Sequence, residues 1–211
     1  MDTSETKQHW ESIYASTPVE QTGWYEEQPT PSLDLIDECN ISKQDRIIDV
    51  GSGASTLIDQ LAEQGYKNIS AVDISEKALQ NLRKRLQKKG LSDQVTLINK
   101  DITQSSALRE HPPVSLWHDR ALLHFLQEEN ARDRYAETVQ NLVKSGGFAV
   151  IAEFSPEGVD KCSGLEVRKY DSSDLSELLG PNFILQKQFD HLYTTPSGGK
   201  RPYIYTLFQK V

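Results

Sequence analysis

Short apolar runs alternate with segments of helical periodicity along most of the chain. Runs rich in Val, Ile, Leu and Phe predict buried strands at residues 46–50, 69–72, 95–99, 114–118 and 147–154. Helices with an apolar face are predicted between and around them, at 3–15, 32–39 with Ser32 as N-cap, from the turn after Val50 to Gly65, from N-cap Ser75 to Gly90, at 128–144 and at 172–179. Such alternation predicts right-handed crossovers and a mostly parallel sheet with helices on both faces.

The last thirty residues depart from this alternation. Residues 183–195 and 201–210 read as two extended runs joined by a turn rich in Pro and Gly. Two such runs predict an antiparallel strand pair at one edge of the sheet, which brings the expected total to seven strands.

The segment Asp49-Val50-Gly51-Ser52-Gly53 suggests where the chain binds a ligand. A strand that ends in a Gly-x-Gly turn and opens into a helix brings backbone N–H groups close to a ligand. Asp73, 20 residues after Gly53, ends the next strand and can accept ribose hydroxyls, and Asp101 follows the third strand. Three acids at successive strand ends face one rim of the sheet, which predicts a nucleoside-cofactor site. The alternatives are that Asp49 caps a helix or pairs with a basic side chain, and that Asp73 and Asp101 serve helix N-termini.

A nicotinamide enzyme fits this pattern poorly. Thr56 stands where the third glycine of a dinucleotide fingerprint is expected. A small reductase would also need a catalytic tyrosine and lysine in one helix, and the run Tyr135-Ala136-Glu137-Thr138-Val139 does not supply that pair.

Net charge and cysteine content indicate which partners, metals and compartments to expect. The formal net charge is −8, so we expect no attraction to nucleic acid or to an anionic membrane. The basic residues 83–85 and 88–89 lie on the polar side of a helix and are expected to form a solvated face. Cys39 and Cys162 form neither a metal spacing nor a disulfide framework, and no membrane-length apolar run occurs, so we expect a cytoplasmic protein without a metal.

The glycine turn, Val72-Asp73-Ile74-Ser75 and the terminal strand pair together resemble the class I S-adenosylmethionine-dependent methyltransferases over residues 30–211. Segments 117–126 and 162–170 resemble a small stand-alone bacterial-type subgroup. The resemblance implies an α/β, Rossmann-like fold and methyl transfer from S-adenosylmethionine, with S-adenosylhomocysteine as product. The acceptor is expected to be a small molecule, with a protein lysine or amine as the alternative and a non-catalytic cofactor-binding interaction protein as a third hypothesis.

The same resemblance assigns roles to the cofactor residues. Gly51, Ser52 and Gly53 let the backbone approach the methionine and the sugar, while Asp49 orients the ammonium and His118 lies beside the cofactor through its backbone.

At the other end of the cofactor, Asp73 accepts both ribose hydroxyls and Ile74 packs on the adenine. Asp101 accepts from the adenine amino group, and Ile102 offers its backbone N–H.

Candidate catalytic residues follow the fourth strand. The sulfonium already activates the methyl group, so the protein has to align and desolvate the nucleophile, and a base is needed for a hydroxyl or an ammonium. His124 and Asp119 are the candidates, with Asp119 as a possible helix N-cap. The alternative is that His124 is a packed histidine bonded to a carboxylate, and that Asp119 and Arg120 form a structural or substrate-orienting pair.

Two further segments are expected to cover the site. We divide the chain into an N-terminal helix and aromatic lid at 1–31 and a methyltransferase domain at 32–211, and we expect a monomer. The lid candidates either close over the cofactor or fasten the N-terminal helix to the domain; they are Trp10, Tyr14, Trp24 and Tyr25. Two residues after the fifth strand, Arg168 and Tyr170, are expected to face the acceptor.

Overall fold

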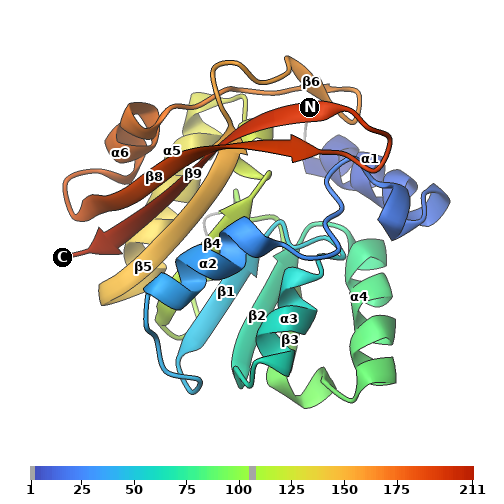
Figure 1. The fold of residues 1–211 in the computed structure, drawn as a ribbon, viewed down its shortest axis with the longest axis horizontal. Coiled ribbons are helices and arrows are strands. Elements are labelled where there is room, and N and C mark those ends of the chain that lie inside the picture. The colour runs from blue at the N-terminus through green and yellow to red at the C-terminus, as the bar shows by residue number, and fades with distance from the viewer. Residues whose placement is uncertain (1–2, 105–107) are drawn as a thin grey trace.

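A computed structural model describes residues 3–104 and 108–211 and contains one central sheet (Figure 1). The seven strands run in the order β3-β2-β1-β4-β5-β9-β8, and only β9 is antiparallel to both of its neighbours. Their bounds are Arg46–Val50 (β1), Asn68–Asp73 (β2), Val95–Asn99 (β3), Val114–Arg120 (β4), Val143–Phe154 (β5), Phe183–Thr194 (β8) and Lys200–Lys210 (β9). The predicted Rossmann-like sheet with an antiparallel terminal pair is therefore confirmed.

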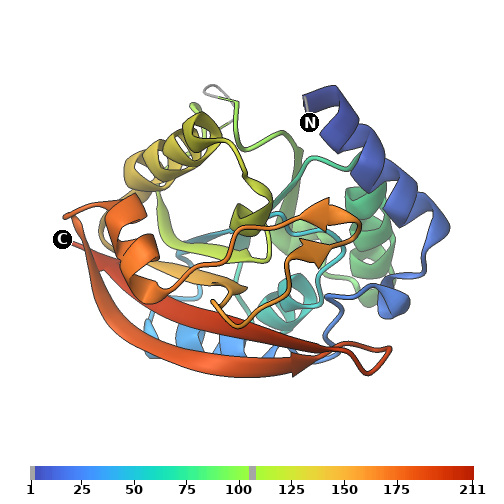
Figure 2. The same ribbon diagram turned by 90° about the horizontal axis from the view of Figure 1, so that it is seen from above.

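Helices cover both faces of the sheet (Figure 2). One face packs against α2 (Thr30–Glu38), α3 (Leu57–Glu63) and α4 (Glu76–Lys89). The other packs against α5 (Glu129–Leu142) and α6 (Ser172–Leu179). Short elements complete the described chain: the 3-10 turns η1 (Val19–Gln21), η2 (Ser92–Gln94) and η3 (Leu123–Phe125), and the hairpin of β6 (Lys161–Cys162) and β7 (Leu165–Glu166).

Alternation along the strands sends neighbouring side chains to opposite faces. Ile47 joins the core under α2 and α3, while Ile48 joins the core under α5. On the next strand, His118 pairs in register with Asp49. The register therefore brings the ends of β1 and β4 together at the rim where open α/β sheets bind ligands.

Several helix and strand boundaries differ from the prediction. Helix α2 begins at Thr30 after Pro29, so Ser32 lies inside the helix and is not its N-cap. Its hydroxyl instead lies 2.9 Å from Nε2 of His118 in the protein interior. Helix α3 begins only at Leu57, because residues 51–56, which include both glycines, form turns and a bend. Strand β5 begins directly at Val143, four residues earlier than expected, and pairs there with Val114.

Helix α1 (Thr3–Ser16) lies beside α4 at the rim of the sheet (Figures 1 and 2). Glu11 connects the two helices, because its carboxylate accepts from the backbone N–H groups of Glu76 and Lys77 at 2.8 and 3.0 Å and from Ser75 Oγ at 3.0 Å. These are unpaired N–H groups of a helix N-terminus, where a negative charge is stabilising. The carboxylate of Glu11, bound at the N-terminus of α4, therefore holds α1 in place.

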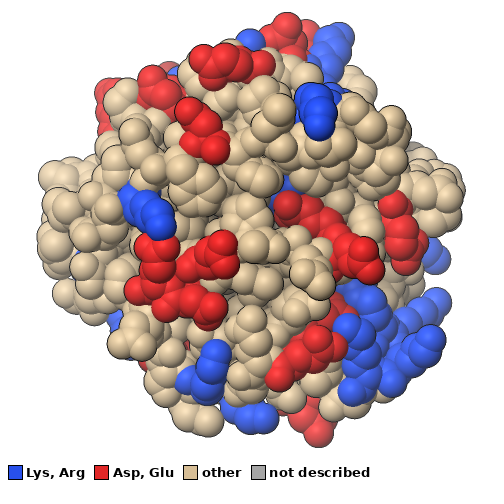
Figure 3. Space-filling view, in the orientation of Figure 1, with Lys and Arg blue, Asp and Glu red and all other residues tan. Residues whose placement is uncertain are grey.

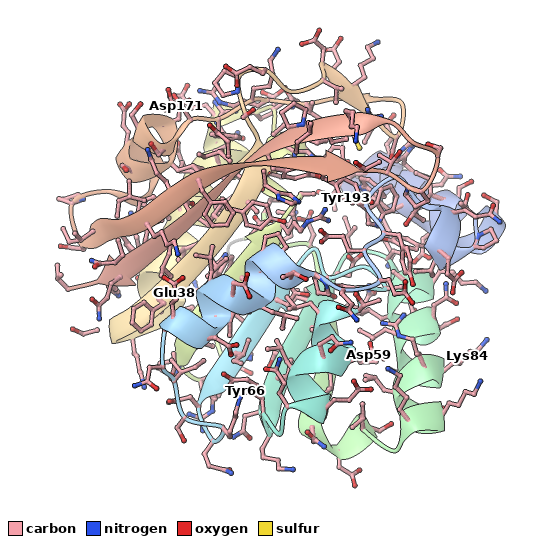
Figure 4. All side chains as sticks on the ribbon, in the orientation of Figure 1. Glu38, Asp59, Tyr66, Lys84, Asp171 and Tyr193 are labelled. Carbon is pink, nitrogen blue, oxygen red and sulfur yellow. The ribbon has the colours of Figure 1, made fainter. Side chains whose placement is uncertain are left out.

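The basic side chains of α4 divide into two groups. Lys84 points outward, in the basic area over α4 (Figures 3 and 4). The prediction that Arg85 belongs to a solvated face is wrong. Arg85 binds the buried Asp59 of α3 through Nε and Nη2, at 2.9 and 2.6 Å. Its guanidinium also donates to the carbonyls of Ala54 and Ser55, at 3.0 and 2.6 Å. Arg85 thus braces the loop that follows the glycine turn.

None of the helices in the described residues has the length and hydropathy needed to cross a membrane.

Candidate active site

Two adjoining cavities lie at the carboxyl ends of the parallel strands. The smaller, here called the polar cavity, includes Asp49, Ser52 and His118 in its wall. The larger, of about 110 Å³ and here called the apolar cavity, extends from Asp73 to His124. The residues common to both walls are Trp24, Gly51 and Arg120.

Both glycines of the turn allow a close approach by another segment. Gly51 has φ of +61°, and a Cβ there would lie 2.5 Å from Cδ1 of Leu122. Gly53 has φ of +53°, and a Cβ there would lie 2.2 Å from the hydroxyl of Tyr14. A side chain at either position would be strained and would also clash. The turn therefore admits α1 on one side and the segment after β4 on the other.

The polar cavity contains buried polar atoms that the protein does not satisfy. Asp49 Oδ1 lies 2.6 Å from His118 Nδ1, and His118 Nε2 is taken by Ser32, so both ring nitrogens of the histidine are occupied. The other carboxylate oxygen of Asp49 and the hydroxyl of Ser52 are buried without a hydrogen-bond partner. Such atoms are costly to leave unsatisfied. An ammonium and a carboxylate, the two groups of a methionine moiety, are suited to satisfy them.

Asp73 lies at the adjoining end of the apolar cavity. Its two carboxylate oxygens accept from the backbone N–H groups of Gly53 and Ser75, both at 2.7 Å. Burial raises the pKa of Asp73 to about 6, although these two hydrogen bonds oppose the rise. The carboxylate retains acceptor capacity toward the cavity, since each oxygen can accept more than one hydrogen bond.

The remaining cofactor candidates line the same end. Ile74, Asp101 and Ile102 all belong to the wall of the apolar cavity. Asp101 also accepts from the backbone N–H of Thr103 at 2.8 Å and from its hydroxyl at 2.7 Å. These contacts close a turn, because no helix lies between Asp101 and β4 in the described residues, and they leave Asp101 on the cavity wall.

Aromatic rings from distant segments also line the apolar cavity. Trp10 of α1 packs edge-on against Trp24, with ring centroids 5.7 Å apart, and against Phe125, at 4.9 Å. Tyr14 is buried and packs edge-on against Trp24 at 5.9 Å. The N-terminal aromatic residues therefore both cover the cavity and fasten α1, while Tyr25 faces the polar cavity.

His124 is fully buried and lines the apolar cavity. Its ring stacks on Phe154 with centroids 4.5 Å apart, and Nδ1 lies 2.6 Å from Oε2 of Glu153, although neither ring nitrogen has an aligned hydrogen bond. Burial lowers the pKa of His124, although the neighbouring thiol of Cys162 opposes this. When Glu153 is ionised it attracts the proton to Nδ1, which leaves Nε2 as the acceptor.

Asp119, the second candidate catalytic residue, lies outside both cavity walls. Because β4 continues to Arg120, its side chain points to the face opposite that of His118. The hydroxyl of Tyr135 donates to Oδ2 at 2.7 Å, and the N–H of Leu122 donates to Oδ1 at 3.0 Å. Asp119 caps no α-helix; it holds the turn that carries His124.

The turn between β4 and η3 is strained, and a carboxylate of β5 stabilises it. Ala121, between β4 and η3, has φ of +70°, which is uncommon for a residue with a Cβ. Glu153 of β5 accepts from the N–H groups of Leu123 and His124, at 3.0 and 3.2 Å. Burial raises the pKa of Glu153 to about 8, against those two hydrogen bonds. An acid within the apolar run of β5 is the sequence signal that would have singled it out.

Arg168 and Tyr170 line neither cavity, contrary to the expectation that they face the acceptor. Arg168 is exposed, and its backbone N–H donates to the carbonyl of His124 at 2.8 Å. Tyr170 is buried in the core beneath α5 and α6. From the segment after β5, Cys162 of the β6–β7 hairpin reaches the cavity instead.

Within the described ranges, no group of three or more His, Cys, Asp or Glu side chains is arranged to hold a metal ion.

Comparison with known proteins gives the same assignment as the site. The family described as methyltransferase domain matches residues 41–193. The chain is 24% identical to EEF1A lysine methyltransferase 2 from Danio rerio over 189 residues, 84% of this chain and 79% of that protein.

Two solved structures share the fold. The S-adenosylmethionine-dependent methyltransferase from Anabaena variabilis superposes with a TM-score of 0.78 at 17% identity and covers 99% of this chain and 95% of its own. The 1,6-didemethyltoxoflavin-N1-methyltransferase of Burkholderia thailandensis, crystallised with its substrate and S-adenosylhomocysteine, gives 0.71 at 17% identity and covers 99% and 87%. With a family match over more than half of its length, the chain belongs to the class I S-adenosylmethionine-dependent methyltransferases.

Proposed function

We propose that this methyltransferase transfers the methyl group to a small molecule held in the apolar cavity. The observation that supports this most directly is the pair of adjoining cavities, which share Gly51, Trp24 and Arg120. The first offers unsatisfied polar atoms for a charged amino-acid moiety. The second continues beyond Asp73 into an aromatic enclosure that contains a neutral histidine.

The cofactor residues divide by their chemistry. Asp49 Oδ2 and Ser52 Oγ face the methionine end, and Asp73 accepts the ribose hydroxyls. Ile74 and Ile102 supply apolar surface for the adenine. When bound, S-adenosylmethionine supplies an electrophilic methyl group on a sulfonium.

The protein's own contribution is to position and deprotonate the acceptor. Trp10, Trp24 and Phe125 exclude water from the enclosure, which strengthens electrostatic interactions inside it. His124 is held by stacking on Phe154 and remains neutral near pH 7, so Nε2 takes a proton from an acceptor hydroxyl or ammonium.

A protein lysine is the second candidate acceptor, and the similarity to the Danio rerio enzyme favours it. The apolar cavity argues against it, because its acidic wall residues are Asp73 and Asp101, both at the cofactor end. The acids of the polar cavity are Asp49, which contacts His118, and Glu26, which pairs with Arg120. A lysine ammonium would therefore find no uncommitted carboxylate at the described aromatic end.

The net charge of −8 supports an acceptor other than nucleic acid, and we include in the proposal a monomer located in the cytoplasm. A purely cofactor-binding interaction protein is less well supported, because the aromatic enclosure continues past the cofactor end.

The cofactor assignment is tested by calorimetry with S-adenosylhomocysteine. Asp73→Ala should weaken binding by roughly 100-fold, since it removes charge-assisted hydrogen bonds worth about 1.5–3 kcal/mol each. The matched control is Asp93→Ala, at an exposed aspartate that lines neither cavity. No heat with the wild type, or equal affinity in both variants, would contradict the assignment.

The acceptor class is tested separately with S-adenosylmethionine carrying a tritiated methyl group. We expect label in the low-molecular-weight fraction of a bacterial extract after incubation with the wild type. Label confined to protein would favour the lysine alternative.

A further inference from the structure

Arg120 is a charged side chain at the boundary between the two cavities. Its side chain is 10% exposed, and it lines both walls. Nε lies 3.0 Å from Oε2 of Glu26 and donates to the hydroxyl of Tyr205 at 3.0 Å, while Nη1 donates to the carbonyl of Trp24, also at 3.0 Å. Two of the three guanidinium nitrogens are therefore fixed by the protein.

Aromatic rings fix the plane of the group as well. The guanidinium carbon lies 4.9 Å from the ring centroid of Tyr193 and 5.0 Å from that of Tyr203. Tyr193, on β8 (Figure 4), donates its hydroxyl to the carbonyl of Tyr25 and so joins the terminal strand pair to the N-terminal segment. Arg120 is consequently preorganised, with little conformational freedom left to lose when a ligand binds.

The third nitrogen, Nη2, has no partner. It is buried and makes no hydrogen bond, although a buried N–H of a charged group is costly to leave unsatisfied. Elsewhere in the described wall of the apolar cavity the cationic side chain is Lys100, which follows β3 beside Asp101 at the adenosine end. Arg120 therefore brings a buried, unpartnered donor to the boundary of the two cavities.

We propose that the methyl acceptor carries a carboxylate, which binds Nη2 of Arg120. This inference rests on the proposed function and adds the chemical class of the acceptor. A carboxylate satisfies the unpartnered donor and interacts favourably with the positive sulfonium. Its apolar body lies among Trp10, Trp24 and Phe125, and its nucleophilic atom is presented to His124.

The carboxylate of the cofactor's methionine moiety could bind the same nitrogen in place of an acceptor carboxylate, because Arg120 also lines the polar cavity. The experiment separates the two sources by measuring acceptor-site binding with the cofactor site already filled.

The probe is benzoate, and benzamide is its neutral counterpart of the same shape. Each is titrated by calorimetry into the wild-type protein saturated with S-adenosylhomocysteine. We expect benzoate to bind at least tenfold more tightly than benzamide, since only the former carries the negative charge. Equal affinities, or no binding of either compound, would overturn the proposal.

The variant arm uses the double substitution Arg120→Met with Glu26→Gln, so that no unpaired carboxylate is left buried. Arg83→Met, an exposed arginine of α4, is the control. The preference for benzoate should disappear in the double variant and persist in the control, and a persistent preference in the double variant would contradict the proposal.

The cofactor arm compares S-adenosylhomocysteine with 5′-methylthioadenosine, which lacks the amino-acid moiety. We expect the double variant to change the two affinities by the same factor. A loss of tenfold or more that is specific to S-adenosylhomocysteine would assign Arg120 to the cofactor and overturn the acceptor role. Failure of the wild type to bind S-adenosylhomocysteine would instead contradict the proposed function, and this inference with it.

Discussion

The polar and apolar cavities are neighbours, yet they are assembled in different ways. In the polar cavity the key side chains come from the ends of adjacent parallel strands, and Asp49 and His118 pair in register across β1 and β4. The aromatic part of the apolar cavity combines α1, the Trp24 loop, η3 and the β6–β7 hairpin. Strand ends are positioned by the sheet itself, whereas the aromatic part depends on separate segments packing together.

The difference shows how the protein divides its tasks. The cofactor end is held by short hydrogen bonds from the backbone to Asp73. The end proposed for the acceptor is built from ring contacts and from a strained turn at Ala121. The first arrangement suits a single ligand such as the cofactor. In the second, substitutions in separate segments of the chain can alter the shape of the cavity.

His124→Ala tests whether the two ends are functionally separate and should have the largest effect. We expect turnover to fall about 10²- to 10⁴-fold, the usual contribution of a positioned base, with little change in affinity for S-adenosylhomocysteine. Turnover is measured by transfer of a tritiated methyl group and affinity by calorimetry.

The matched control is His191→Ala, which lies on β8 and lines neither cavity. Unchanged turnover in the His124 variant would remove His124 from the mechanism. A parallel loss of cofactor affinity would show that the two ends are not independent.

Glu11→Ala tests the attachment of α1, which contributes rings to both ends. Loss of its contacts with the N-terminus of α4 should lower the free energy of unfolding by about 1–2 kcal/mol, as for a lost helix cap. Release of S-adenosylhomocysteine should accelerate by about tenfold for each 1.4 kcal/mol lost from the closed state. Stopped-flow tryptophan fluorescence reports both Trp10 and Trp24.

Glu20→Ala, at an exposed glutamate of η1, serves as the control. If release is unchanged while stability falls, α1 only fastens the structure and does not control access.

Glu153→Gln tests the support of the His124 turn through the pH dependence of stability. The pKa of Glu153 is raised from 4.5 to about 8, so between these values the folded protein keeps a proton that the unfolded chain releases. Stability contributed by this group therefore falls as pH rises toward 8, by up to about 1.4 kcal/mol per pH unit. Urea unfolding of the glutamine variant at pH 6.5 and 8 should show a shallower dependence.

Turnover of the wild type should change in the opposite direction over the same interval. Ionised Glu153 attracts the Nδ1 proton of His124 and leaves Nε2 as a base, so methyl transfer should rise as pH approaches 8. Identical pH profiles in the wild type and the glutamine variant would remove Glu153 from this role.

Much of the cofactor end was predictable because its signals are local. The Gly51 turn, Asp73 and N-cap Ser75 each follow from a few neighbouring residues, and the seven-stranded sheet follows from the alternation of apolar runs. Helix boundaries were less predictable, because Ser32 reads as an N-cap until its hydroxyl meets His118 from another element. Arg85 was misassigned to a solvated face, and the position of Asp119 outside both cavities was not predicted, for a similar reason: their partners lie in other elements.

By itself, the sequence determined the sheet, the rim and the acids that face a nucleoside cofactor, because periodicity and strand-end motifs are properties of contiguous residues. Only the tertiary structure decided that Glu153 lies beneath His124, that Glu11 binds the end of α4, and that Arg120 keeps one nitrogen free between two cavities. These are contacts between residues tens of positions apart, and a local pattern carries no information about which distant atoms complete it.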